Sequence, residues 1–179
     1  YQLAAKDLVP VTLELGGKSP CVIEADANLK VAAKRIAIGK FLNAGQTCIA
    51  PDYLLIHASV KDQFLQFLKE SIASFYTKEA VTSEDYGRII NAKRFDTLLS
   101  YLQQGTIVYG GKYDKENLFI EPTILDNVNV NSTIMTEEIF GPVLPVFTFN
   151  TKAEAVELIN KNPNPLSFYV FTSSIKKEE

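Results

Sequence analysis

The stretch PCVIEADANLKVAAKRIAIGKFLNAGQTCIAPDYLLI, residues 20–56, says most about the fold. It begins and ends with short apolar segments, residues 20–24 and 53–56, which have the length and composition of buried strands. Between them, residues 29–42 carry apolar side chains at helical spacing, and Asn28 just before them is a suitable N-cap. Two strands joined by a helix of this length predict a β-α-β unit with parallel strands.

The same alternation continues on both sides of this unit. Upstream, residues 11–15 predict a short strand that ends at Gly16-Gly17. Downstream, we expect helices at residues 59–72 (capped by Ser59), 91–103 (stopped at Gly105) and 151–160 (capped by Thr151), and strands at 106–109, 143–149 and 167–171.

These elements predict an α/β fold: a doubly wound, mostly parallel sheet with helices on both faces. Such sheets usually bind ligands at the carboxyl ends of their strands, so we expect the functional edge there. Glu14, near the end of its predicted strand, fits that expectation.

Composition excludes several classes of protein. A chain of 179 residues fits one domain, and 46% hydrophobic and 22% charged residues are typical of a globular protein with a real core. A net charge of −3 implies no broad basic surface for nucleic acid, and no apolar run is long enough to span a bilayer. One histidine and two separated cysteines offer no metal site and no disulfide framework, and favour a reducing, cytoplasmic location.

Cys48 is the first candidate for chemistry. It lies in Gly45-Gln46-Thr47-Cys48, a small, polar, turn-prone segment. A free cysteine is most often a small buried hydrophobic residue, but these neighbours favour an exposed turn. There a thiolate can act as a nucleophile, and the backbone N–H of Cys48 could help to hold an oxyanion. Cys21, inside an apolar strand, is predicted to be structural.

Glu14 is the second candidate, as a general base. It stands between two leucines in Leu13-Glu14-Leu15-Gly16-Gly17-Lys18. A glutamate there could simply point to solvent, whereas crowding by apolar neighbours would suit it to activate water near neutral pH. The two glycines allow close approach of the backbone to a ligand.

A third segment, Glu137-Glu138-Ile139-Phe140-Gly141-Pro142, places two acids before an aromatic residue and a Gly-Pro turn. It is either a solvated turn or a carboxylate for sugar hydroxyls beside an aromatic wall, and the pattern alone leaves both open. His57, at the end of a strand, is predicted to be structural, which argues against a Cys–His dyad. The glycine-rich phosphate loops of nucleotide-binding proteins do not occur in the sequence.

Three segments together resemble the aldehyde dehydrogenase family. Residues 13–20 resemble its glutamate motif, residues 45–48 its cysteine motif and residues 137–143 its cofactor-ribose motif, in the family's order. The extension Ile49-Ala50-Pro51-Asp52-Tyr53 and the short interval from Cys48 to Glu138 resemble the class 3 branch, which includes fatty and aromatic aldehyde dehydrogenases. The resemblance covers nearly all of the chain.

The resemblance implies roles for the matching residues. Cys48 would attack the aldehyde carbonyl, hydride would pass to NAD or NADP, and Glu14 would activate the water that hydrolyses the resulting thioester. Glu138 would hold the nicotinamide ribose, with Phe140 near the nicotinamide and Leu15 and Gly16 also in the cofactor site. Glu14 and Glu138 could share the work of the base. The partner would be an aldehyde, and the whole enzyme a homodimer.

Both ends of the sequence look cut, because residues 1–7 resemble the end of a helix and residues 173–179 the start of one. The family's dinucleotide-binding domain and oxyanion-hole asparagine lie upstream of its glutamate motif. We therefore expect residues 1–179 to be a catalytic domain without its dinucleotide-binding domain, with little dehydrogenase activity alone.

Two other readings remain open. A thiol hydrolase or acyltransferase would also use a cysteine thioester, but residues 137–142 have no obvious use there. A binding or assembly domain that has lost its activity would have had no need to keep Cys48, Glu14 and Glu138 together.

Overall fold

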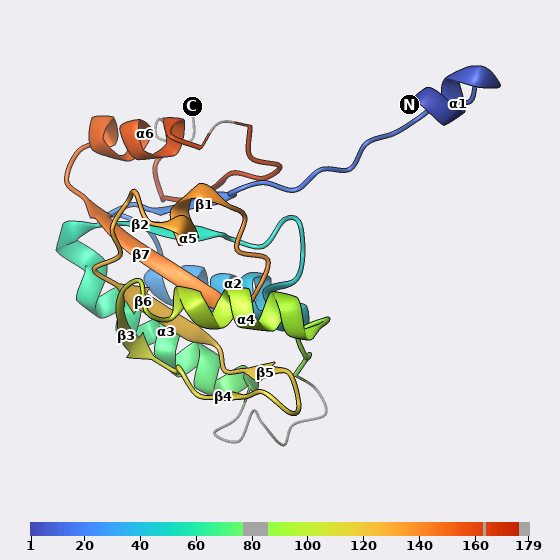
Figure 1. Cartoon of the computed structure of the whole chain (residues 1–179). Coiled ribbons are helices and arrows are strands. Elements are labelled where there is room, and N and C mark those ends of the chain that lie inside the picture. Colours follow the sequence, from blue (N-terminus) through green and yellow to red (C-terminus); the bar gives the residue numbers. More distant parts are fainter. Residues whose placement is uncertain (77–85, 163, 176–179) are drawn as a thin grey trace.

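The computed structural model describes residues 1–76, 86–162 and 164–175 (Figure 1). Within them the main sheet has six strands, in the order β3-β6-β7-β2-β1-β8. Their bounds are β1 Pro20–Ile23, β2 Tyr53–His57, β3 Thr106–Tyr109, β6 Thr123–Asp126, β7 Val143–Phe149 and β8 Tyr169–Phe171. All neighbouring pairs are parallel except β3 and β6, so the predicted α/β class with a mostly parallel sheet is confirmed.

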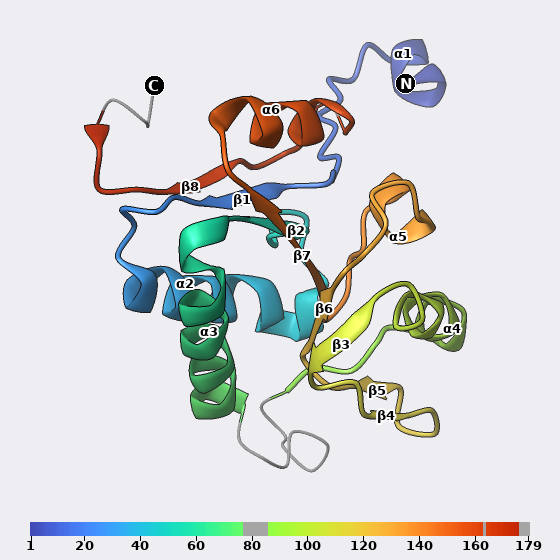
Figure 2. The ribbon, with the colours of Figure 1, turned by 90° about the vertical axis from the view of Figure 1, so that its left-hand side faces the viewer.

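Helices cover both faces of this sheet. Figure 2 shows α2 and α3 on one face and α6 on the other, while α4 lies beside β3 on the side away from α3. The helical segments are α1 Gln2–Lys6, α2 Leu29–Phe41, η1 Leu42–Gly45, η2 Ala58–Val60, α3 Lys61–Tyr76, α4 Ala92–Tyr101, α5 Thr133–Thr136 and α6 Lys152–Asn160. A small hairpin pairs β4 Tyr113–Asp114 with β5 Phe119–Ile120.

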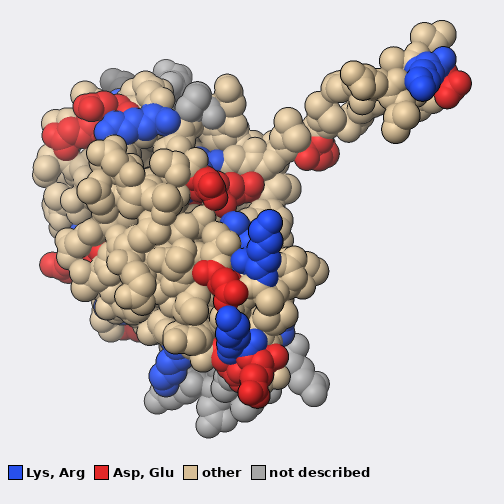
Figure 3. Space-filling model, in the orientation of Figure 1, with Lys and Arg blue, Asp and Glu red and all other residues tan. Residues whose placement is uncertain are grey.

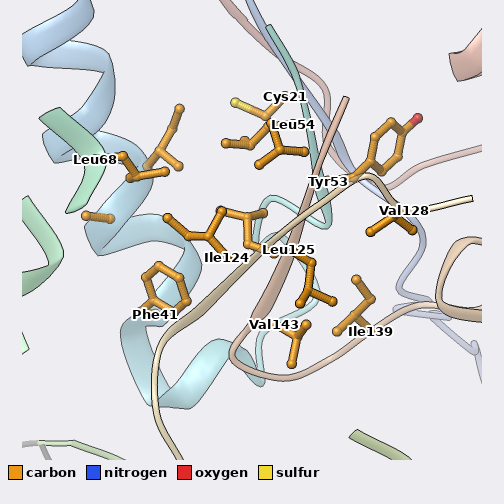
Figure 4. Close-up of a cluster of buried hydrophobic side chains, with 14 of the residues drawn as sticks. Cys21, Phe41, Tyr53, Leu54, Leu68, Ile124, Leu125, Val128, Ile139 and Val143 are labelled. Carbon is orange, nitrogen blue, oxygen red and sulfur yellow. The ribbon is translucent and has the colours of Figure 1, made fainter. Parts of the chain in front are cut away.

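The β1-α2-β2 unit forms the centre of the core. Cys21 of β1 lies beside Leu54 of β2 in the parallel register, and both side chains are fully buried (Figure 4). Asn28 caps α2 by accepting a hydrogen bond from the Val31 N–H, as its position predicted. Burying a side chain such as Leu54 contributes about 1.5–3 kcal/mol, so this unit anchors the loops at its ends.

The functional segments lie at the opposite edge from the one expected. Residues 14–18 precede β1, Cys48 precedes β2, and residues 137–142 precede β7, so all three lie at the amino ends of parallel strands. The expectation of a carboxyl-edge site is therefore wrong. The physical reason is that α2 returns the chain to the amino ends of the strands, and Cys48 lies in the connection from α2 to β2.

The N-terminal segment departs most from expectation. Residues 11–15 form no strand; they are exposed and unpaired in the part of the chain that the structure describes, because no neighbouring strand offers a ladder. With α1 they project from the body as an arm, residues 1–15, whose surface is mostly uncharged (Figures 1 and 3). On the face shown in Figure 3, acidic and basic residues of the body are interspersed.

Several boundaries also differ. The side chain of His57, rather than Ser59, accepts the capping hydrogen bond of the turn before α3. The helix predicted at residues 91–103 ends at Tyr101, with Leu102 and not Gly105 at its C-cap. The elements β4, β5, β6 and α5 were not predicted; β4 and β5 have only two residues each, which is too short for an apolar pattern to show. Of the helix start expected at 173–179, residues 176–179 lie outside the described residues.

Candidate active site

Cys48 is exposed on a turn, as predicted, whereas Cys21 is fully buried. The turn follows three consecutive residues in the left-handed region: Asn43 at φ 52°, Ala44 at φ 53° and Gly45 at φ 74°. Left-handed backbone costs a non-glycine residue about 1–2 kcal/mol. Surrounding contacts must therefore hold this turn, and with it the thiol.

One such contact joins the cysteine segment to the third segment. A Cβ atom built on Gly45 would stand 2.3 Å from the carbonyl oxygen of Gly141, which is backbone and cannot move aside cheaply. Only glycine satisfies both the positive φ and this close approach.

We expect Gly45→Ala to lower the free energy of unfolding by about 3 kcal/mol, from left-handed strain and overpacking together. The matched control is Gly39→Ala in α2, where the nearest atom to a Cβ is Pro51 Cδ at 3.8 Å. That change should stabilise the chain by about 0.5–1 kcal/mol. Urea unfolding of both variants measures the contrast, and equal stabilities would show that Gly45 is not constrained.

Glu138 lies against the glycines of the first segment. A Cβ on Gly16 would stand 2.3 Å from Glu138 Oε2, and the backbone N–H of Gly17 donates a hydrogen bond to this carboxylate. Burial raises the pKa of Glu138, and the Gly17 hydrogen bond opposes the rise. The glycines thus allow the backbone to lie close to Glu138 of the same chain, and their predicted close approach to a ligand stays a prediction.

A buried ion pair holds all three segments together. Lys18 and Asp52 are 6% and 3% exposed, and the Lys18 ammonium group contacts Asp52 Oδ2. Lys18 Nζ also donates to the carbonyl oxygens of Ile134 at 2.7 Å and Glu137 at 2.9 Å. Asp52 Oδ1 accepts from the Ile139 N–H at 2.9 Å. Lys18 and Asp52 lie four residues after Glu14 and Cys48, respectively. Their ion pair therefore brings both candidate segments to the segment that carries Glu138.

Lys40 is a second buried cation close to this pair. It lies in the last turn of α2 and is 1% exposed. Burial lowers the pKa of Lys40 to about 8; the carboxylate of Asp52 opposes this shift, the ammonium group of Lys18 adds to it, and Glu138 opposes it.

The lowered pKa of Lys40 makes stability depend on pH in a defined direction. From pH 8 to about 10.5 the unfolded chain holds a proton that the folded chain has lost, so the unfolding free energy rises with pH. Below pH 8 both states are protonated and the burial penalty is constant. Relative to Lys40→Met, we expect the wild-type chain to gain about 3 kcal/mol between pH 7.5 and 10.5. A stability difference that stays constant over this range would contradict the lowered pKa.

The other residues predicted to take part in the site lie at the surface. Glu14 is exposed, and its neighbours Leu13 and Leu15 are 53% and 66% exposed, so the expected apolar crowding of Glu14 is not present. Gly16 is exposed, and Phe140 is 37% exposed with φ 44°. Neither Cys48 nor Glu14 makes a hydrogen bond or ion pair within the described ranges.

His57 is structural, as predicted. Its Nδ1 accepts from the Ser59 N–H, its ring packs edge-on against Phe149, and it ends β2, whereas Cys48 lies before the start of that strand. A Cys–His dyad is therefore excluded. Among residues 1–76, 86–162 and 164–175, no helix is long and apolar enough to cross a membrane.

Several residues that join the segments of the site were not predicted: Lys18 and Asp52 in the ion pair, and Gln46 and Arg94 through hydrogen bonds to backbone groups. A signal for two of them was present, because Lys18 and Asp52 each stand close to the start of an apolar strand. A charged residue at the start of a buried strand is either exposed or paired with an opposite charge. Its partner can be identified only once the strands are placed side by side.

The fold and the site define a class: an α/β domain that presents an exposed thiol and a half-buried carboxylate at the amino ends of parallel strands. The sequence profile of the aldehyde dehydrogenase family matches residues 1–179, and the chain belongs to this family.

Individual relatives agree with this assignment. The chain is 51% identical over 174 residues to 4,4'-diaponeurosporen-aldehyde dehydrogenase of Staphylococcus aureus, covering 96% of this chain and 38% of that protein. It is 49% identical over 175 residues to mouse aldehyde dehydrogenase family 3 member A2, covering 98% and 36%. The solved substrate-bound structure of Staphylococcus aureus AldH superposes with a TM-score of 0.93 at 48% identity, covering 99% and 39%. The chain therefore spans less than two fifths of the length of these relatives.

Proposed function

We propose that this chain is the nucleophile-bearing domain of an NAD(P)-dependent aldehyde dehydrogenase, which oxidises aldehydes to carboxylic acids. Its family membership supports the proposal. The observation that carries it is the convergence of three segments at one edge of the sheet, where Lys18, Asp52 and Glu138 join them. Within the proposal, residues 1–179 act together with a dinucleotide-binding domain.

The proposed chemistry begins at Cys48. Its sulfur attacks the aldehyde carbonyl carbon, a C–S bond forms, and the backbone N–H of Cys48 donates to the oxyanion of the thiohemiacetal. The oxidant would be NAD(P)⁺, which when bound would take up the aldehydic hydrogen as hydride. A thioester then remains on Cys48.

Glu14 completes the cycle in this proposal. Its carboxylate takes a proton from water, the water oxygen attacks the thioester, and the C–S bond breaks to release a carboxylic acid and the Cys48 thiolate. Because Glu14 is exposed on an extended segment, it can reach water without a change in the core. Glu138 is the alternative base, and its half-buried carboxylate is the less accessible of the two.

The residues present fit a cofactor on this edge. Glu138 offers carboxylate oxygens for ribose hydroxyl groups, and the missing side chain at Gly16 leaves room for that carboxylate. Exposed Phe140 and Leu15 offer apolar surface for a nicotinamide ring. We assign Glu138, Phe140, Leu15 and Gly16 to the cofactor side of the site.

The experiment uses the full-length dehydrogenase that this proposal defines, with NAD⁺ and NADP⁺ and both an aliphatic and an aromatic aldehyde. We expect aldehyde-dependent NAD(P)H formation by the full-length enzyme, and less than about a hundredth of that rate from residues 1–179 alone. A full-length enzyme that forms no NAD(P)H with any of these pairs would sink the proposal.

Thioester hydrolysis separates the two candidate bases. Glu14→Gln should slow the release of acid after the first turnover by about 10²-fold or more while the first NAD(P)H burst persists. Hydrolysis at the wild-type rate in Glu14→Gln would transfer the role of base to Glu138.

The proposal extends to a cytoplasmic homodimer. Cys21 and Cys48 form no disulfide with each other, which fits a reducing compartment, and a rat relative, 47% identical, is named as dimeric.

A further inference from the structure

A segment outside the three motifs connects two of them. This bridging segment, residues 86–94, begins against the left-handed turn: a Cβ on Gly87 would stand 3.2 Å from the carbonyl carbon of Asn43 and 3.3 Å from the nitrogen of Ala44. It ends in α4, where Arg94 donates from Nη2 to the carbonyl oxygens of Glu138, at 2.9 Å, and Ile139. One end therefore contacts the cysteine segment and the other the Glu138 segment.

Gln46 attaches the cysteine segment to this bridge. Its Nε2 donates to the carbonyl oxygens of Arg88 at 2.9 Å and Asn43 at 3.1 Å. Its Oε1 accepts from the Ile90 N–H at 3.0 Å. One side chain thus uses both amide hydrogens and its oxygen on three backbone groups, two residues before Cys48.

The backbone of Gln46 also closes the turn, by two hydrogen bonds with Asn43. Asn43 Nδ2 donates to the Gln46 carbonyl oxygen at 3.2 Å, and the Gln46 N–H donates to the Asn43 carbonyl oxygen at 3.2 Å. Asn43 and Ala44 hold left-handed backbone that costs about 1–2 kcal/mol each, so the turn depends on the contacts around it, and the side-chain hydrogen bonds of Gln46 are among these contacts.

We propose that Gln46 is a positioning residue for the reaction: through the bridging segment it fixes the thiol of Cys48 relative to the Glu138 carboxylate. This inference rests on the proposed function. A misplacement of reacting groups by 1 Å can cost about 10²-fold in rate, so a local relaxation is enough to affect catalysis without unfolding the domain.

Two variants of the full-length dehydrogenase test this. Gln46→Met keeps the length of the side chain and removes all three hydrogen bonds. Gln46→Glu keeps an acceptor for the Ile90 N–H. It places a carboxylate, which cannot donate, against the carbonyl oxygens of Asn43 and Arg88. The matched control is Gln66→Met, since Gln66 lies exposed on α3 and bonds only Glu70 among the described residues.

In both Gln46 variants we expect kcat to fall by about 10–100-fold, with the KM for NAD(P)⁺ within about threefold of wild type. Amide hydrogen exchange should become faster in peptides covering 43–50 and 86–90 and stay unchanged in β1. Gln66→Met should match wild type in every readout.

A kcat within twofold of wild type in both variants would overturn the inference, as would unchanged exchange at 43–50. Failure of both variants to fold would overturn it too, because Gln46 would then determine folding rather than position. Hydrogen exchange needs no turnover, so it tests the attachment even if the wild-type enzyme oxidises no aldehyde and the proposed function fails.

Discussion

Cys48→Ala in the full-length dehydrogenase is expected to lower kcat/KM for aldehyde oxidation by about 10⁴-fold or more, because the proposed thioester forms on the sulfur of Cys48. The variant should remain folded, since Cys48 is exposed and makes no hydrogen bond within the described residues. Steady-state NAD(P)H formation measures the loss.

The second cysteine is the control for this variant. Cys21 is fully buried in β1, and burial raises the pKa of its thiol, so it remains protonated. Cys21→Ala should cost about 1 kcal/mol of stability, mainly as a small cavity, and leave kcat within twofold of wild type. Iodoacetamide should alkylate Cys48 and spare Cys21. Substantial activity in Cys48→Ala would refute the assignment of the nucleophile.

Asp52→Ala is expected to have the largest effect on stability. It leaves the Lys18 ammonium group buried with only two carbonyl oxygens, and it removes the acceptor of the Ile139 N–H. Breaking a buried pair in this way typically costs about 3–5 kcal/mol. Urea unfolding measures this, and the same variant should lower kcat, because three segments lose their common anchor.

Two comparisons isolate the cause. Lys18→Met combined with Asp52→Leu removes both charges, so it should be about 2 kcal/mol more stable than Asp52→Ala while remaining poorly active. Asp96→Ala breaks the exposed pair between Lys115 and Asp96 and should cost less than about 1 kcal/mol. If Asp52→Ala costs no more than Asp96→Ala, the buried pair does not organise the site.

The sequence predicted correctly those elements that are determined by residues close together in the chain. Asn28 and Thr151 each cap a helix, as predicted, by accepting a hydrogen bond from the N–H three residues ahead. Asn91, predicted as the first helical residue, also proves to be a cap of this kind. The apolar runs of β1 and β2 predicted buried parallel strands correctly, because their environment is apolar on both faces.

The features that could not be predicted from the sequence depend on contacts between residues far apart in the chain. Lys18 and Asp52 are partners only after β1 and β2 align in register, and Gln46 finds Ile90 only after α4 is placed. The edge that carries the site was mispredicted because the general rule concerns connections from strand to helix, whereas Cys48 follows the helix. The expected strand at 11–15 failed because alternation of apolar residues cannot show whether a partner strand exists.

The most direct test of the account is the chemical identity of the intermediate. Full-length enzyme is mixed with aldehyde and NAD(P)⁺, quenched in acid within one turnover, digested and analysed by mass spectrometry. The account predicts an acyl group, two hydrogens lighter than the aldehyde adduct, on the peptide that contains Cys48 and not on the one that contains Cys21. Turnover with an unmodified Cys48, or acylation at another residue, would contradict it.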